Sequence, residues 1–170
     1  KVGGRDVEED IAVVHKAFEA RNSGIKMVLD ANRSLTVKDA IFLSNACQDL
    51  NFALEQPCNS YADIKSLKGK ISHPIFIDES ATGIQMVCKS IQDEVADGFG
   101  MKITRVGGLS NTITIRDICR NFERPMTCED TWGGDIMAAA CVHMGATIAP
   151  KLLEGVWIPD NYIDGNYDDD

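Results

Sequence analysis

Residues 27–55 read MVLDANRSLTVKDAIFLSNACQDLNFALE, and this stretch decides the fold. It opens on an apolar run that ends at Asp30, and it closes on a second apolar run that ends at Glu55. Between the two runs, Thr36 and Asp39 form a Thr-x-x-Asp capping box, which predicts the start of a helix. Two short strands joined by one helix make a β/α/β unit, and such a connection makes the two strands parallel.

The same pattern repeats along the chain at nearly even intervals. Five polar residues mark the repeat, with spacings of 29, 25, 23 and 24 positions: Lys1, Asp30, Glu55, Asp78 and Lys102. The last four of them each end a short apolar run. A strand, a helix and two loops take up about that many residues. The spacing therefore predicts a repeating β/α enzyme whose chemistry lies at the carboxyl ends of its strands.

Apolar periodicity predicts a helix after most of the strands, at 7–22, after Thr36, at 61–67, at 84–95, after Ser110 and at 135–148. Two further strands are expected at 125–128 and at 152–158. The helix at 135–148 is rich in Ala and Gly, so we expect it to pack closely against its neighbours. Alternation of this kind is typical of a parallel α/β sheet.

Two architectures fit a parallel α/β sheet, an open doubly wound sheet and a closed barrel. An open sheet usually carries a phosphate-binding loop, and neither G-x-G-x-x-G nor a Walker sequence occurs here. We therefore expect a (β/α)8 TIM-type barrel. Eight strands need about 200 residues or more, whereas this chain has 170. We expect residues 1–170 to be one catalytic domain, a C-terminal barrel present only in part.

Composition excludes several classes of partner. The net charge of -9, with no stripe of Lys and Arg, argues against nucleic acid. No apolar run approaches the roughly 20 residues that span a membrane. The six cysteines contain no C-x-x-C pair or zinc-binding spacing, which favours buried, reduced thiols in a cytoplasmic protein. We expect a small-molecule substrate, and a homo-oligomer for the full-length protein.

The five repeated residues define a chemistry when they are placed on a ring of eight strands. Lys1 and Lys102 then lie on strands four apart, so they face each other across the mouth of the barrel, with the three carboxylates on the arc between them. Three carboxylates without His or Cys favour a hard cation, and Mg²⁺ is the first choice. The lysines are candidate acid/base groups that remove a proton next to a substrate carboxylate.

Taken singly, each of these residues has a simpler interpretation. An Asp after a strand is most often a helix cap or a turn residue, and a lysine is most often solvated on the surface. The order and phase of all five together favour the catalytic interpretation.

Four motifs resemble the mandelate racemase/muconate lactonizing branch of the enolase superfamily: Asp30-Ala-Asn32, Glu55-Gln-Pro57, Asp78-Glu-Ser80 and the stretch from Lys102 to Leu109. The resemblance implies that Asp30, Glu55 and Asp78 bind Mg²⁺ and that Lys102 is one general base. Lys1 resembles the second lysine of the family's Lys-x-Lys pair and hence the other base. Asn32 is then expected to support the metal site or the substrate. The family's first barrel strand and its N-terminal capping domain are absent from this sequence.

Residues 129–135 resemble the members of this family that act on proline derivatives. Trp132 is expected to cover a five-membered ring, and Asp130 to pair with the ring nitrogen. The leading hypothesis is dehydration of cis-3-hydroxy-L-proline by a lyase. The alternatives are 2-epimerisation of a proline betaine and a barrel fragment without catalytic activity.

Overall fold

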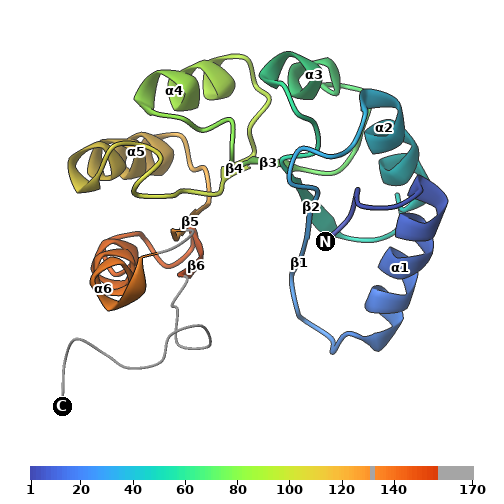
Figure 1. The fold of residues 1–170 in the computed structure, drawn as a ribbon, viewed down its shortest axis with the longest axis horizontal. Helices are drawn as coiled ribbons and strands as arrows, with labels where there is room; N and C mark the ends of the chain where they lie inside the picture. Colours follow the sequence, from blue (N-terminus) through green and yellow to red (C-terminus); the bar gives the residue numbers. More distant parts are fainter. Residues whose placement is uncertain (131–132, 157–170) are drawn as a thin grey trace. The chain divides into compact units, whose positions relative to one another are not determined.

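The computed structural model describes residues 1–130 and 133–156. The chain divides into two compact units, the first formed by residues 1–80 and 92–97 and the second by residues 81–91 and 98–170. Helices and strands alternate along the described chain (Figure 1), in the order α1 Val7–Ala20, β1 Met27–Asp30, α2 Val37–Ala46, β2 Phe52–Glu55, α3 Tyr61–Ser66, β3 Ile75–Ile77, α4 Ile84–Gln92, β4 Gly98–Phe99, α5 Leu109–Asn121, β5 Met126–Cys128, α6 Gly134–Gly145 and β6 Leu153–Val156. This alternation confirms the partial (β/α) barrel.

The strands of the first unit are parallel, and their register aligns their carboxyl ends. β1 pairs with β2 so that Asp30 lies directly opposite Glu55, and β2 pairs with β3 so that Glu55 lies opposite Phe76. The segment that carries Lys1 continues this edge, because the Val2 amide donates a hydrogen bond to the Asp30 carbonyl oxygen at 3.0 Å. Two residues of the repeat, Asp30 and Glu55, are therefore strand ends, Asp78 directly follows a strand, and Lys1 lies beside them on a segment that is not a strand.

The helices of the first unit begin where side chains cap them. The Thr36 side chain accepts a hydrogen bond from the Asp39 amide at 3.1 Å, which confirms the predicted capping box, and Ser60 caps α3 in the same way through Asp63. The buried residues of α2 are Ala40, Leu43 and Ser44, whereas Ala46 is exposed. The core of the unit consists of apolar side chains that are almost fully buried: Val14, Leu29, Leu43, Phe52, Leu54, Ile64 and Leu67.

The second unit repeats the parallel pairing. β4 pairs with β5 through Phe99 and Met126, and β5 pairs with β6. α5 begins after Gly108, whose φ of 102° suits glycine, so the predicted cap at Ser110 was wrong by two residues. α6 confirms the expected close packing, because a Cβ on Gly145 would overlap the Val156 side chain.

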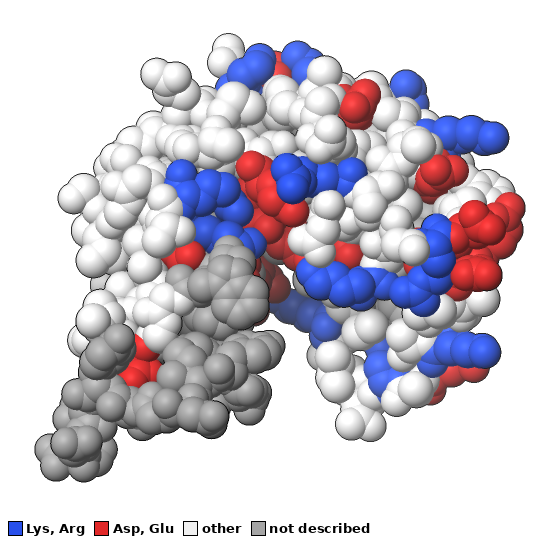
Figure 2. All heavy atoms as spheres, viewed as in Figure 1, with Lys and Arg blue, Asp and Glu red and all other residues white. Residues whose placement is uncertain are grey.

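Two further features of the sequence can be located. All six cysteines are free, and five of them are buried, while Cys88 is exposed. Among the described residues, no helix is both long and apolar enough to cross a membrane. On the face drawn in Figure 2, blue and red side chains are interspersed over the first unit rather than gathered by sign.

Candidate functional site

The carboxyl edge of the first unit carries the three predicted metal ligands. Asp30 ends β1, Glu55 ends β2, and Asp78 directly follows β3. Asp30 and Glu55 are paired in register and are half-buried, whereas Asp78 is 2% exposed. Because parallel strands end at the same edge of a sheet, the fold places all three carboxylates on one edge of this unit.

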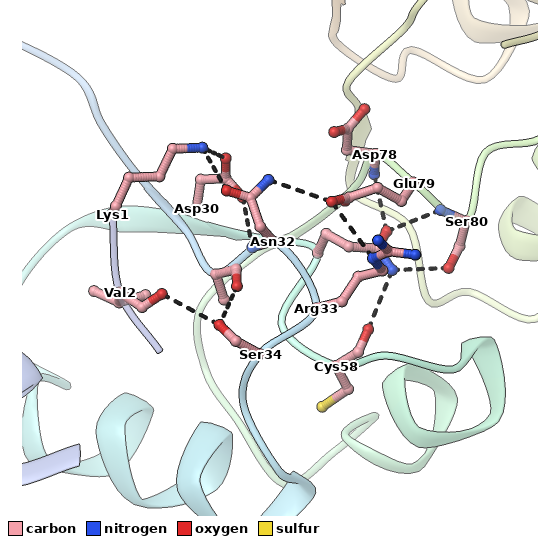
Figure 3. A network of polar contacts seen from close by, with 12 residues as sticks. Lys1, Val2, Asp30, Asn32, Arg33, Ser34, Cys58, Asp78, Glu79 and Ser80 are labelled. Atoms are coloured by element: carbon pink, nitrogen blue, oxygen red, sulfur yellow. Dashed lines mark hydrogen bonds and ion pairs between the residues drawn. The ribbon is translucent and has the colours of Figure 1, made fainter. Parts of the chain in front are cut away.

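Lys1 lies against this edge (Figure 3). Its Nζ forms an ion pair with the Asp30 carboxylate, and it donates a second hydrogen bond to Oδ1 of Asn32 at 2.6 Å. The backbone amide of Asn32 in turn donates to Oδ1, the other carboxylate oxygen of Asp30, at 2.8 Å. The structure therefore brings together one predicted base, one predicted metal ligand and the predicted supporting residue.

The charges at this edge act jointly on the Lys1 ammonium. Partial burial lowers the pKa of Lys1, but the hydrogen bond to Asp30 and the charges of Asp30, Glu55 and Glu79 oppose that effect and raise the pKa overall. Three carboxylates thus stabilise a positive charge at one place. That place is an electrostatically favourable position for a cation.

The donor set at this edge fits Mg²⁺ in its chemistry. The three predicted ligands offer only carboxylate oxygens, which Mg²⁺ prefers to nitrogen or sulfur. Within residues 1–130 and 133–156, no three His, Cys, Asp or Glu side chains converge closely enough to hold a metal ion as they stand. Side-chain movement at Asp30, Glu55 and Asp78 would be required for these residues to share one ion.

Asn32 and Glu79 lie beside Lys1 at the carboxyl edge of the first unit and contact each other. Asn32 has a φ of 42°, a left-handed conformation that Asn tolerates better than most residues. Its Nδ2 donates to Oε1 of Glu79 at 3.3 Å, and Arg33 lies 3.7 Å from the same oxygen. Glu79 had no separate predicted role, and the structure places it as a fourth carboxylate beside Lys1 and Asn32.

Gln56 is a functional residue that the sequence analysis missed. It follows Glu55 with a φ of 37° and is fully buried. Its Oε1 accepts the amide hydrogens of Asp78 and Ser80, each at 3.1 Å. Its Nε2 donates to the Ser80 hydroxyl at 2.8 Å and to the Cys58 carbonyl at 3.2 Å. One side-chain amide thus joins the end of β2 to the loop that carries Asp78.

The sequence carried little signal for this role. A buried side-chain amide must satisfy both its donors and its acceptor. Its partners lie on segments that only the folded chain brings together, so spacing does not reveal them.

Lys102 lies in the second unit, at the carboxyl ends of β4 and β5. β4 ends at Phe99, three residues before Lys102, and Lys102 forms an isolated parallel bridge with Glu129. The Glu129 amide donates to the Met101 carbonyl at 2.9 Å, and the Ile103 amide donates to the Glu129 carbonyl at 3.3 Å. The half-buried Lys102 therefore has the strand-end position that the repeat predicts.

Asp130 has a structural contact that the sequence did not indicate. It is 4% exposed, and its two oxygens accept from the Thr104 amide and hydroxyl, each at 2.8 Å. These bonds fix the loop that follows Lys102. A role of Asp130 toward a substrate nitrogen stays a prediction, and Trp132 lies outside the described residues.

Comparison with known proteins identifies the family. The model of the family described as "Enolase C-terminal domain-like" matches residues 1–170. The chain is 35% identical over 144 residues to a cis-3-hydroxy-L-proline dehydratase of Roseibium aggregatum, covering 85% of this chain and 39% of that protein. The chain thus spans well under half the length of this relative.

Solved structures agree with this match. A mandelate racemase/muconate lactonizing enzyme from Roseovarius nubinhibens superposes with a TM-score of 0.91 at 33% identity, over 98% of this chain and 45% of the other. A second protein from that organism, described as a putative mandelate racemase/muconate lactonizing enzyme complexed with magnesium, gives a TM-score of 0.84 at 28% identity, over 88% and 40% of the two chains. The chain belongs to the enolase C-terminal domain-like family, in its mandelate racemase/muconate lactonizing branch.

Proposed function

We propose that the protein removes the α-proton of a small carboxylate substrate in a Mg²⁺-dependent reaction. The observation that carries the proposal is the position of Lys1, whose ammonium is ion-paired to Asp30 beside Glu55 at the carboxyl edge of the first unit. An amine at this position is able to take a proton from a substrate that lies over the strand ends. Asp30, Glu55 and Asp78 are the residues that would hold the metal ion.

Each group has a distinct task in this proposal. Mg²⁺, when bound, supplies positive charge that stabilises the substrate's developing enediolate and offsets the carboxylate charges that raise the pKa of Lys1. The neutral amine of one lysine accepts the α-proton, and the electron pair of the C–H bond passes into the substrate carboxylate. Asn32 holds Lys1 in place through its side-chain oxygen, and it holds Asp30 in place through its backbone amide.

We further propose that the substrate is cis-3-hydroxy-L-proline. After the α-proton leaves, the enediolate electrons form the Cα–Cβ double bond while the 3-hydroxyl departs with a proton as water. The enamine product then tautomerises to a pyrroline carboxylate. Support comes from the dehydratase relative and from the resemblance of residues 129–135 to members that act on proline derivatives.

A second candidate reaction is 2-epimerisation of a proline betaine. The sequence favours it, because the repeat predicts two candidate bases, Lys1 and Lys102, one to remove the proton and one to return it. In this reaction no substituent leaves the ring.

Incubation in heavy water tests the two candidates. The purified protein is mixed with Mg²⁺ and each substrate, and the products are followed by proton NMR, with EDTA as the metal-free control. Pyrroline formation that EDTA abolishes supports dehydration, whereas α-deuteration with inversion and no loss of water supports epimerisation. If neither substrate reacts or exchanges, both proposals fail and the non-catalytic alternative is favoured.

A further inference from the structure

Asp10 is a buried carboxylate on a face of α1 that is otherwise apolar. It is 0% exposed, although its neighbours Glu8 and Glu9 are exposed. Asp10 shares the inward face of the helix with Val7 and Val14, at spacings of three and four residues. A charge buried at such a position is costly unless specific partners compensate for it.

The partners of Asp10 both lie in the segment that precedes α1. Oδ2 accepts a hydrogen bond from the Gly3 amide at 2.5 Å. Oδ1 lies 3.2 Å from Nε of Arg5, so the carboxylate joins two points of that segment to the helix. A hydrogen bond to an ionised acceptor is roughly twice as strong as a neutral one, which makes this an effective anchor.

The anchored segment is the one that carries Lys1. Val2 is bound on one side, through its amide, to the Asp30 carbonyl, and Gly3 is bound on the other side to Asp10. Gly3 has a φ of 86°, and a Cβ at this position would overlap the Ser34 hydroxyl, so the path of the backbone is closely constrained. The Lys1 side chain itself is 69% exposed, so little packing surrounds it. Its position depends on its backbone and on the contacts of its Nζ with Asp30 and Asn32.

We propose that Asp10 is a positioning residue for the proposed base Lys1, acting through the Gly3 amide and Arg5 rather than by transferring a proton. This inference rests on the proposed function of Lys1. A displacement of about 1 Å at a catalytic group costs on the order of 100-fold in rate. Loss of the anchor should therefore impair the reaction that uses Lys1 and spare the reaction that uses Lys102.

Three variants and one control separate this role from general stability. Asp10→Leu removes the acceptor of the Gly3 amide and the ion pair with Arg5, and it keeps the branched shape of the side chain; the Arg5 side chain is 39% exposed, so its charge can remain in solvent. Asp10→Asn keeps one acceptor for the Gly3 amide and should restore part of the function. Lys1→Ala supplies the reference for complete loss of the base. The matched control is Glu9→Gln, an exposed acid one position away.

The first measurement is hydrogen exchange of the Gly3 amide, which needs no catalytic activity. We expect exchange to be at least tenfold faster in Asp10→Leu than in Glu9→Gln, and intermediate in Asp10→Asn. Equal exchange in Asp10→Leu and the control would overturn the proposal. If Asp10→Leu fails to fold, the comparison between Asp10→Asn and the control decides in the same way.

The second measurement is solvent deuterium incorporation into the two C2 epimers of 3-hydroxyproline, each of which presents its α-proton on one face. Lys1→Ala identifies the epimer whose exchange uses Lys1, because it abolishes that exchange. Asp10→Leu should slow the same exchange by about 100-fold. It should change the exchange of the other epimer by less than threefold. An equal loss on both faces, or no loss on either, would refute a positioning role. If the unaltered protein neither exchanges nor dehydrates either epimer, the proposed function fails and the positioning role with it, while Gly3 exchange still decides the anchor.

Discussion

Replacing Gln56 by Leu should destabilise the first unit through the loop that carries Asp78. The change removes four hydrogen bonds from a fully buried amide and leaves the side-chain volume similar. Two backbone amides, those of Asp78 and Ser80, lose their acceptor. A buried donor left without a partner costs about 1–3 kcal/mol.

These contributions give an expected loss of about 3–5 kcal/mol in the free energy of unfolding, since two orphaned amides dominate and part of the cost is recovered by local rearrangement. Urea denaturation followed by circular dichroism measures this loss. Gln48→Leu is the matched control, because Gln48 is exposed in the same unit, and its effect should stay within about 0.5 kcal/mol.

Gln56→Glu separates the hydrogen bonds that the Gln56 side chain accepts from those that it donates. A carboxylate still accepts from Asp78 and Ser80, but it has no hydrogen to give to the Cys58 carbonyl or the Ser80 hydroxyl, and it places a charge in a fully buried position, so we expect a loss at least as large as that of Gln56→Leu. If Gln56→Leu were as stable as Gln48→Leu, the amide would not hold this loop, and the reasoning would be refuted.

Three further predictions concern the rest of the described chain. Thr36→Ala should lower the free energy of unfolding by about 0.5–2 kcal/mol by removing the cap of α2, and thermal denaturation that shows no shift would contradict this. Gly145→Ala should cost about 1–3 kcal/mol because the new methyl group overlaps Val156, and Val156→Ala should recover part of that cost in urea titrations of the double variant. Burial raises the pKa of the Cys128 thiol to about 12, so this thiol stays protonated well above neutral pH. Iodoacetamide at pH 8 should therefore label the exposed Cys88 in the native protein and leave Cys128 unlabelled, as peptide mass spectrometry would show.

Spacing alone was enough to predict the frame of the site. Asp30 and Glu55 end apolar runs 25 residues apart, and the observed register places them opposite each other. This works because a strand, a helix and two loops have nearly fixed lengths, so equivalent strand ends recur at a steady interval. The cap at Thr36 was predictable for a similar reason, since its signal lies within four residues.

The residues that hold this frame in place could not be predicted in the same way. Asp10 and Gln56 are buried polar side chains whose partners lie on segments that only the folded chain brings together. The start of α5 was misplaced because the left-handed conformation of Gly108 made a serine cap unnecessary. Lys1 was predicted as a strand end, but it lies on no strand of the structure; the hydrogen bond from the Val2 amide to the Asp30 carbonyl oxygen holds its segment beside β1.

The central claim is that the carboxylates at the carboxyl edge of the first unit bind Mg²⁺ for proton abstraction. Isothermal titration calorimetry with Mg²⁺ tests it most directly, on the unaltered protein and on Asp30→Asn, Glu55→Gln and the exposed-site control Glu9→Gln. We predict one ion per chain, with affinity at least tenfold weaker in Asp30→Asn and in Glu55→Gln and unchanged in Glu9→Gln. Binding that is equally strong in all four proteins, or absent from the unaltered one, would contradict the account.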